Sequence, residues 1–264
     1  MLRRGSQWSG IEWIGLALVA MAWEVVGRLD LIQPAGSLPP LTAVLAVLAD
    51  DSTVWALLSA AAATAYRALG GLAIATAVGV PLGLFMGGLP GVGRLLRIPV
   101  ELLRMLPPIA IIPVAILFLG IFDHMKIAVV AFGAMWPIVL ASRDGVLRID
   151  RVLIDTARCL SLSPTDMFFR VAAFAALPSI IVGIRISLAI SLIVSVAADM
   201  LVGSTGLGFL IIDSERSFQT PLMYASLCCV ALMGGLFSWA FDQFLGSRRW
   251  PPWIRHLADV KLPI

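Results

Sequence analysis

Long uncharged, apolar runs alternate with short charged segments along this chain. A helix needs about 20 mostly apolar residues to cross a bilayer, because hydrocarbon offers no partner to a bare backbone group. The pattern predicts six such spans, at residues 13–23, 68–93, 105–122, 127–142, 171–198 and 217–241. We therefore expect an all-α polytopic membrane protein with about six transmembrane helices.

Three further segments shape this prediction. Residues 52–66 are uncharged and alanine-rich, and we interpret them as a helical lead-in to the second span rather than a seventh crossing. Residues 41–48 follow two prolines with amphipathic spacing, which predicts a short helix lying on one membrane surface. The first run resembles a signal peptide, but Glu12 interrupts its approach, so we expect an uncleaved first span.

The longest charged stretch, residues 143–170, separates the fourth and fifth predicted spans. Apolar residues with helical spacing lead up to Leu160, and the pattern stops at Ser161. Ser163 can then cap a second helix, with Pro164 at its first position and Asp166 three residues after the cap. The stretch therefore predicts a helix-turn-helix between two spans.

Composition agrees with a membrane protein. Hydrophobic residues make up 60% of the 264 residues and charged residues 13%, with a mean hydropathy of +0.98. Soluble domains carry about 45–50% apolar and about 25% charged residues. The excess excludes a single soluble globular domain, and with Lys126 and Lys261 as its lysines the chain is no soluble nucleic-acid binder, despite a pI near 9.1.

Basic residues predict the orientation. Most of the 19 lysines and arginines lie in segments that the six spans place on one side of the membrane: both ends of the chain, residues 94–97 and the 143–170 stretch. The segments on the other side contain only Arg28, Lys126 and Arg216. The side richer in basic residues is the cytoplasmic one. We expect a cytoplasmic tail at 1–12, one transmembrane domain at 13–245 with its loop at 143–170, and a second cytoplasmic tail at 246–264.

Sequence patterns for hydrolytic chemistry are absent. Neither lysine lies in the Gly-Lys-Ser/Thr of a phosphate-binding loop, two histidines cannot form a His-Glu-x-x-His zinc site, and no Gly-x-Ser-x-Gly occurs. Cys159, Cys228 and Cys229 are interpreted as small buried hydrophobes. We predict no enzyme activity and no cofactor in this chain, so the energy for any transport comes from another chain or from an ion gradient.

A few residues are candidates for a transport path. Charges in or beside spans are costly and are usually functional or paired, which singles out Arg104, Arg185 and Asp199. Arg185 lies too far from Asp199 along the helix to be its local partner, and snorkelling to the interface is an equal alternative. Pro107 marks a helix break of the kind that transport paths use.

Glycines recur every fourth residue in the second span, at Gly79, Gly83 and Gly87. Small residues at this spacing let two helices approach closely. We favour packing within the chain over a seam between two copies.

The 143–170 stretch resembles the EAA loop of bacterial ABC importer permeases. Asp155-Thr156-Ala157 stands where that family has Glu-Ala-Ala, with Ser161 at its glycine and Phe174 at its first proline. The resemblance implies that this loop docks on a separate ATPase, through Asp155, Thr156, Ala157, Arg158, Leu160 and Ser161.

Other segments extend the resemblance over residues 60–212. Residues 101–113, 118–126, 183–188, 197–201 and 203–210 are similar, in order, to the permeases for sulfonates, taurine, nitrate, bicarbonate and thiamine precursors. This implies a multi-pass subunit of the bacterial inner membrane that works with an ABC ATPase holding ATP and magnesium. A solute-binding protein, a second copy of the chain and membrane lipid are the other implied partners, with a small anion as solute.

Two alternatives remain open at this point. A secondary transporter would use an ion gradient and take up solute as a lone chain. A noncatalytic anchor would associate with a membrane enzyme regardless of solute. A co-purifying ATPase distinguishes the ABC permease from both.

Overall fold

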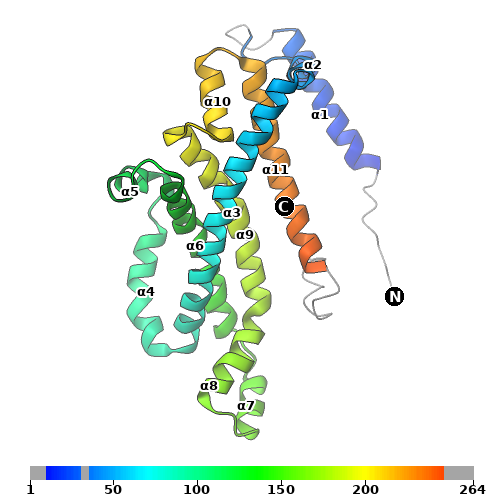
Figure 1. The fold of residues 1–264 in the computed structure, drawn as a ribbon. Coiled ribbons are helices and arrows are strands. Elements are labelled where there is room, and N and C mark those ends of the chain that lie inside the picture. Colours follow the sequence, from blue (N-terminus) through cyan, green and yellow to red (C-terminus); the bar gives the residue numbers. More distant parts are fainter. Residues whose placement is uncertain (1–9, 31–35, 247–264) are drawn as a thin grey trace.

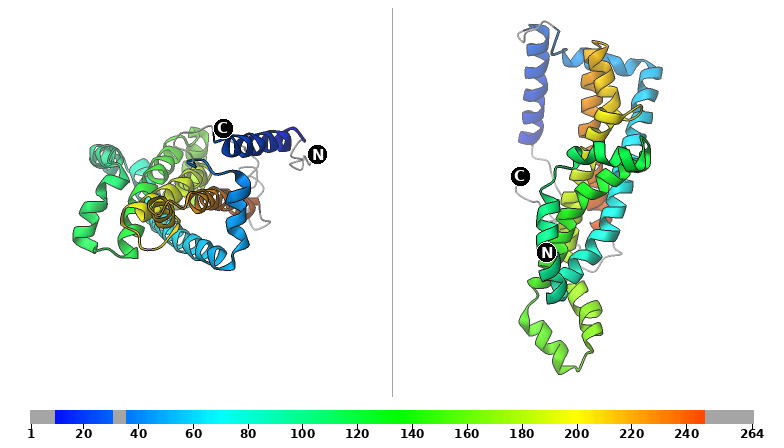
Figure 2. Two further views of the ribbon diagram at one scale, coloured as in Figure 1. Left: turned by 90° about the horizontal axis from the view of Figure 1, so that it is seen from above. Right: turned by 90° about the vertical axis from the view of Figure 1, so that its left-hand side faces the viewer.

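Three long helices lie side by side and form the body of the protein. The computed structural model describes residues 10–30 and 36–246, and within those ranges every regular element is a helix. The central three are α3 (Asp51–Gly88), α6 (Asp123–Leu147) and α9 (Ala173–Val202), which pack on one another along most of their length (Figures 1 and 2). The predicted all-α class is confirmed.

The remaining elements lie around this bundle. Figure 1 shows α7 and α8 at one end, α2 and α10 at the other, and α1 standing to one side. The peripheral elements are α1 (Gly10–Arg28), α2 (Leu41–Ala46), η1 (Val47–Ala49), α4 (Pro90–Arg104), η2 (Pro108–Ile111), α5 (Ile112–Leu119), α7 (Arg151–Cys159), α8 (Pro164–Asp166), the π-helical η3 (Met167–Ala172), α10 (Leu207–Arg216) and α11 (Thr220–Gly246).

The structure contains most of the predicted spans as helices. In the described part of the chain, four helical segments are long and apolar enough to cross a membrane: Asp51–Gly88, Asp123–Leu147, Pro164–Val202 and Thr220–Gly246. A fifth is obtained if Pro90–Arg104 and Pro108–Leu119, bent by 88° at their junction, count as one broken span. The sequence predicted about six.

Two of the predicted spans need comment, the third and the first. Residues 105–122 do not form a straight helix, because Pro107 and Pro108 remove backbone donors and push the preceding residues out of helical geometry. Residues 13–23 lie within α1, which is tied to α2: the Glu24 carboxylate accepts a 3.0 Å hydrogen bond from the Thr42 backbone N–H.

The lead-in interpretation of residues 52–66 is confirmed, since α3 runs without interruption from Asp51 to Gly88. Asp50 caps its first turn by accepting from the Thr53 backbone N–H at 3.1 Å. Hydrogen bonds from Ser52 and Thr53 lower the pKa of the Asp50 carboxyl below its ordinary value. The short helix expected at 41–48 is present as α2 and η1. The predicted tails lie almost wholly outside the described residues.

The glycine stripe packs α3 against α6 inside the chain, as favoured from the sequence. A Cβ added at Gly83 would stand 2.6 Å from the Ser142 Cβ, and one at Gly87 would stand 2.7 Å from the Arg143 backbone oxygen. Gly79 faces Ile138 at 3.2 Å in the same way. Only glycine permits this helix separation, because real Cβ atoms do not approach neighbours so closely.

Gly83→Ala is expected to destabilise the protein by about 1–3 kcal/mol, the usual range for overpacking a tight core. Gly70→Ala is the matched control, because its new Cβ would meet Ile127 at an ordinary 3.6 Å. Thermal unfolding of both purified variants provides the measurement. Equal midpoints would contradict a tight α3–α6 seam.

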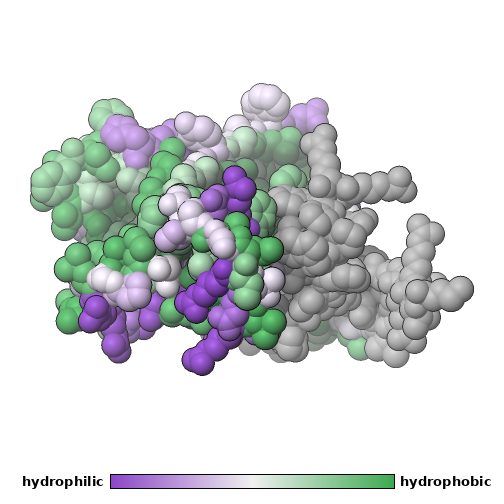
Figure 3. All heavy atoms as spheres, turned by 90° about the horizontal axis from the view of Figure 1, so that it is seen from below, coloured by the Kyte–Doolittle hydropathy of each residue, from purple (hydrophilic) through white to green (hydrophobic). Residues whose placement is uncertain are grey.

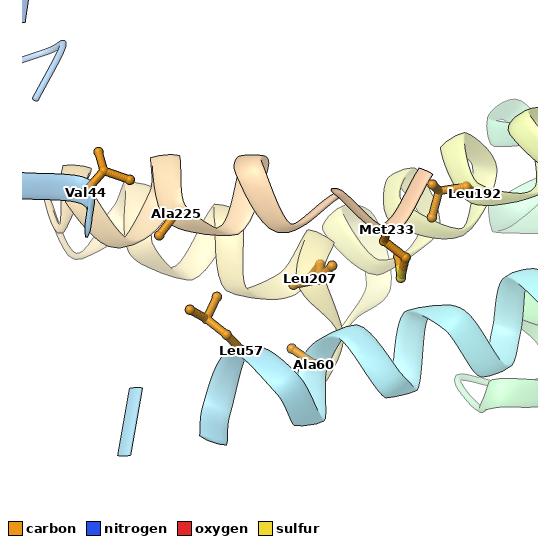
Figure 4. Packing of buried hydrophobic residues seen from close by; sticks show 7 residues of the cluster. All are labelled: Val44, Leu57, Ala60, Leu192, Leu207, Ala225 and Met233. Atoms are coloured by element: carbon orange, nitrogen blue, oxygen red, sulfur yellow. The ribbon is translucent and has the colours of Figure 1, made fainter. Parts of the chain in front are cut away.

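A hydrophobic cluster joins the bundle to the elements at the end opposite α7. Figure 4 shows Leu57 and Ala60 of α3 near Leu207 of α10, with Ala225 and Met233 of α11 across from them. Both Leu57 and Leu207 are almost completely buried. This packing fixes α10, and the loop before it, against α3 and α9.

The end of the bundle that carries α7 and α8 is polar. Figure 3 views this end and shows hydrophilic residues gathered there, with hydrophobic residues along the sides. Apolar flanks with a polar end fit a protein surrounded by lipid.

Candidate functional site

A buried charge cluster joins the three central helices near α10. Asp199 on α9 has no exposed surface, and its side chain accepts hydrogen bonds from three other side chains. Its carboxylate accepts from Arg67 Nη1 of α3 at 2.6 Å, from Lys126 Nζ of α6 at 3.1 Å and from Thr64 Oγ1 at 2.8 Å. A charge buried this deeply is stable only with such partners.

Arg67 is the centre of the cluster. Its Nε donates to Asp123 at 2.8 Å, and its Nη1 also donates to the Thr205 backbone oxygen at 2.9 Å. Its Nη2 donates to Thr205 Oγ1 at 2.6 Å and lies 2.8 Å from Asp123. Four hydrogen bonds and one ion-pair contact therefore engage all three nitrogens of the guanidinium, with two carboxylates and one loop residue as partners.

The loop before α10 closes over this cluster. Gly206 has φ +109°, and a Cβ there would stand 2.7 Å from the Asp199 Cγ and 2.8 Å from Arg67 Nη1. Thr64 Oγ1 accepts from the Leu207 backbone N–H at 2.9 Å. Only glycine combines this backbone with so close an approach. The cluster thus fastens α10 to the interior of α3, the start of α6 and the end of α9.

The other predicted path residues lie elsewhere. Arg185 of α9 donates to Asp242 of α11 at 2.9 Å, so it is paired across two helices. Arg104 pairs with Glu101 one turn away on the exposed side of α4, and Pro107 precedes η2 at the 88° bend. The structure does not bring these three residues together with Asp199.

The predicted helix-turn-helix is present. α7 is followed by a turn at 160–163, and Ser163 Oγ accepts from the Asp166 backbone N–H at 3.1 Å to cap α8. Val152 and Leu160 are each 70% exposed, whereas Ala157 is 3% exposed and faces its own chain. Asp155 and Arg158 pair at 3.3 Å on the outer surface, and Thr156 Oγ1 donates to the Val152 oxygen at 2.7 Å.

Two expectations about this loop are therefore corrected. Ala157 cannot meet a partner protein directly, because its helix buries it. Cys159 is exposed rather than buried, because it falls on the outer face at the last turn of α7.

Ser161 occupies a position that favours glycine. Its φ is +54°, its N–H bonds to the Arg158 oxygen at 2.8 Å, and the Leu162 N–H bonds to the Ala157 oxygen at 3.2 Å. These two bonds form the Schellman motif that ends many helices with a left-handed residue. The glycine of the EAA pattern thus has a conformational cause here.

Ser161→Gly is expected to stabilise the end of α7 by about 1 kcal/mol, because a side chain in the left-handed region costs that much. Hydrogen exchange should show the amides of the last turn of α7 protected about fivefold more. Ser163→Gly, which removes the α8 cap, is the opposing control and should raise exchange in α8. Unchanged protection in Ser161→Gly would show that position 161 carries no strain.

The helix-turn-helix is joined to two of the central helices. The π-helical η3 continues directly into α9. Phe168 in η3 stacks on Phe85 of α3 with ring centroids 5.5 Å apart, and a Cβ at Gly88 would stand 2.7 Å from its ring. The helix-turn-helix is therefore in contact with α3 as well as continuous with α9, and both helices carry members of the charge cluster.

Sequence reasoning missed most of the cluster around Asp199. Lys126 was assigned to an outer loop, but it lies in the first turns of α6 and is 4% exposed. Arg67 was not among the residues that the sequence singled out. Its isolation within an uncharged run from 52 to 93 was the available signal, since such a charge needs a partner.

Known proteins resemble this chain over most of its length. The family model described as "Binding-protein-dependent transport system inner membrane component" matches residues 79–247. The taurine transport system permease protein TauC of Escherichia coli (strain K12) is 30% identical over 246 residues, which cover 90% of this chain and 87% of TauC. The nitrate import permease protein NrtB of Synechocystis sp. is 33% identical over 177 residues, covering 67% of this chain and 64% of NrtB.

A solved structure shares the fold. A chain of the MetNI methionine ABC transporter in an inward-facing conformation superposes with a TM-score of 0.67 at 19% identity, covering 79% of this chain and 99% of that one. Such a likeness concerns the fold and leaves the solute open. With the family match, it identifies the chain as a binding-protein-dependent transport system inner membrane component, the membrane permease subunit of an ABC importer.

Proposed function

We propose that this permease carries a small anion, of the sulfonate, taurine or nitrate type, across the inner membrane. The observation that carries this proposal is the 30% identity to a taurine permease over 90% of the chain. The similarity to a nitrate permease supports the same class of solute.

The partners follow from the geometry of α7 and α8. This polar end carries exposed apolar side chains at Val152 and Leu160, which suit docking on a protein rather than contact with water. We assign it to a cytoplasmic ABC ATPase that binds ATP and magnesium, and in this proposal this end of the bundle faces the cytoplasm. A separate binding protein delivers the solute at the opposite end.

We further propose that two copies of the permease work on two ATPase subunits. One copy provides one helix-turn-helix, whereas two copies provide one for each ATPase. The mass of the solubilised, transport-competent complex tests this, and a competent complex with one permease and no ATPase would contradict it.

Uptake into vesicles tests the function itself. The permease is reconstituted with its ATPase and binding protein, and uptake of labelled taurine, methanesulfonate and nitrate is measured with and without internal or external ATP. We expect anion uptake that requires ATP on the α7 side. Uptake driven by a proton or sodium gradient in the lone chain would instead establish the secondary transporter.

A further inference from the structure

A hollow of about 350 Å³ lies against the charge cluster, and Lys126 is not among the residues that line it. Arg67 and Asp123 line it together with three hydroxyl residues, Ser59, Ser204 and Thr205. The hollow is large enough for a small solute, since ligand pockets begin near 300 Å³. It is therefore the place where the cluster faces a space that another molecule can enter.

The buried part of the cluster carries an excess positive charge. The side chains of Arg67, Lys126 and Asp199 are 3%, 5% and 0% exposed, so two cations are buried with one anion. An uncompensated buried charge is strongly destabilising. The fourth group, Asp123, supplies the missing negative charge.

Asp123 supplies it from the exposed side. Its side chain is 55% exposed, and it contacts the Nε and Nη2 edge of Arg67 at 2.8 Å on each nitrogen. Asp123 is also the first residue of α6, where it makes no other hydrogen bond or ion pair within the described ranges. An exposed anion held by one cation exchanges with solution anions far more readily than Asp199 does.

The edge of Arg67 that Asp123 contacts also suits an oxyanion. Two parallel N–H donors match two oxygens of a sulfonate, nitrate or carboxylate group. Thr205 Oγ1 accepts from Arg67, which leaves its own proton free to donate, and the Ser204 hydroxyl lies on the same wall. A third oxygen of the same anion therefore also has donors nearby.

We propose that this hollow is an anion site, in which the oxyanion group of the transported solute replaces Asp123 as the second counter-ion of Arg67. The identity of this anion as the solute rests on the proposed function. One anion replaces another, so the buried excess charge stays compensated and Asp199 keeps both of its cations. Thr205, Ser204 and Arg67 are the residues assigned to recognise the oxyanion.

The test removes the carboxylate of Asp123, which pairs with Arg67 in the structure. In Asp123→Ala, only an added anion can act as the second counter-ion of Arg67 beside Asp199. Sodium methanesulfonate should therefore raise the Tm of the permease–ATPase complex in phosphatidylcholine nanodiscs. We expect Tm to rise by about 3 °C at about tenfold the Kd, with a clearly smaller rise in the wild type, where Asp123 competes. Asp51→Ala is the matched control, because it removes an exposed aspartate of α3 that does not line the hollow, and it should respond like the wild type.

A response of Asp123→Ala no larger than that of Asp51→Ala overturns the proposal. Asp123→Asn covers the case in which the alanine variant does not fold: it keeps an acceptor for Arg67 but loses the charge, and it must show the same enhanced anion response. A rise produced by phosphatidylglycerol in the nanodisc but not by methanesulfonate assigns the site to lipid and also overturns the proposal.

This experiment is separable from the test of function. Wild-type uptake of anions without an enhanced Tm response in Asp123→Ala would refute the site alone. An enhanced Tm response in a permease that imports no anion would refute the proposed function and leave an anion site of another purpose.

Discussion

Asp199→Ala is expected to abolish uptake at every solute concentration. The substitution leaves Arg67 and Lys126 buried without their shared carboxylate and removes the acceptor of Thr64 Oγ1. Losing one member of a buried ion pair costs about 3–5 kcal/mol, a large part of the 5–15 kcal/mol that typically stabilises a folded protein. The loss falls where α3, α6, α9 and the α10 loop meet.

The measurement is uptake, with solute-stimulated ATP hydrolysis, across a concentration series in reconstituted vesicles. Asp213→Ala is the matched control, because Asp213 of α10 is exposed and forms no ion pair within the described ranges. A residue that only bound solute would raise the apparent KM and leave the maximal rate intact. Full recovery of Asp199→Ala at saturating solute would therefore contradict a role in assembly or switching.

Leu160→Glu is expected to separate the permease from its ATPase while leaving membrane insertion normal. Leu160 is 70% exposed at the end of α7, next to the Schellman turn. A carboxylate placed in an apolar contact loses hydration without gaining a partner, which costs several kcal/mol and lowers affinity by a factor of 10 for each 1.4 kcal/mol. Transport should fall with the lost association.

Co-purification of the ATPase and uptake by the same preparation provide the measurement. Leu48→Glu adds the same charge at a half-exposed leucine of η1, near the opposite end of the molecule, and should leave the complex intact. Ala157→Arg is a different experiment: it is expected to disrupt α7 itself, because Ala157 is buried. An intact complex and normal uptake in Leu160→Glu would show that α7 is only a solvated connector.

Local sequence signals determined much of the fold. Apolar runs of sufficient length predicted helices that the structure contains at 68–88, 127–142, 171–198 and 220–241, because hydrocarbon leaves a backbone few alternatives. Ser163, Pro164 and Asp166 predicted the start of α8, since capping depends on residues three apart in the chain. Gly79, Gly83 and Gly87 predicted a close helix pair for the same local reason.

The bend at Pro107 and Pro108 shows the limit of span counting. Hydropathy sums the apolar character of 105–122 and is blind to the direction of the chain, so it predicted one straight crossing. Two consecutive prolines turn the chain by 88° between α4 and α5. The expectation that Ala157 contacts a partner protein had a similar cause. A sequence pattern shows that a helix has an apolar face, but it does not show whether that face packs against the same chain.

The site depended most on tertiary structure. The sequence marked Asp199 as a charge that needs a partner, but the partners Arg67 and Lys126 lie 132 and 73 residues away. No local rule relates positions that distant, since only the packing of α3, α6 and α9 brings them together. The sequence by itself therefore indicated a helical membrane permease with a capped helix-turn-helix between two spans. The tertiary structure decided which charges meet, because a buried charge is stabilised by the groups that packing places around it and not by its neighbours in the chain.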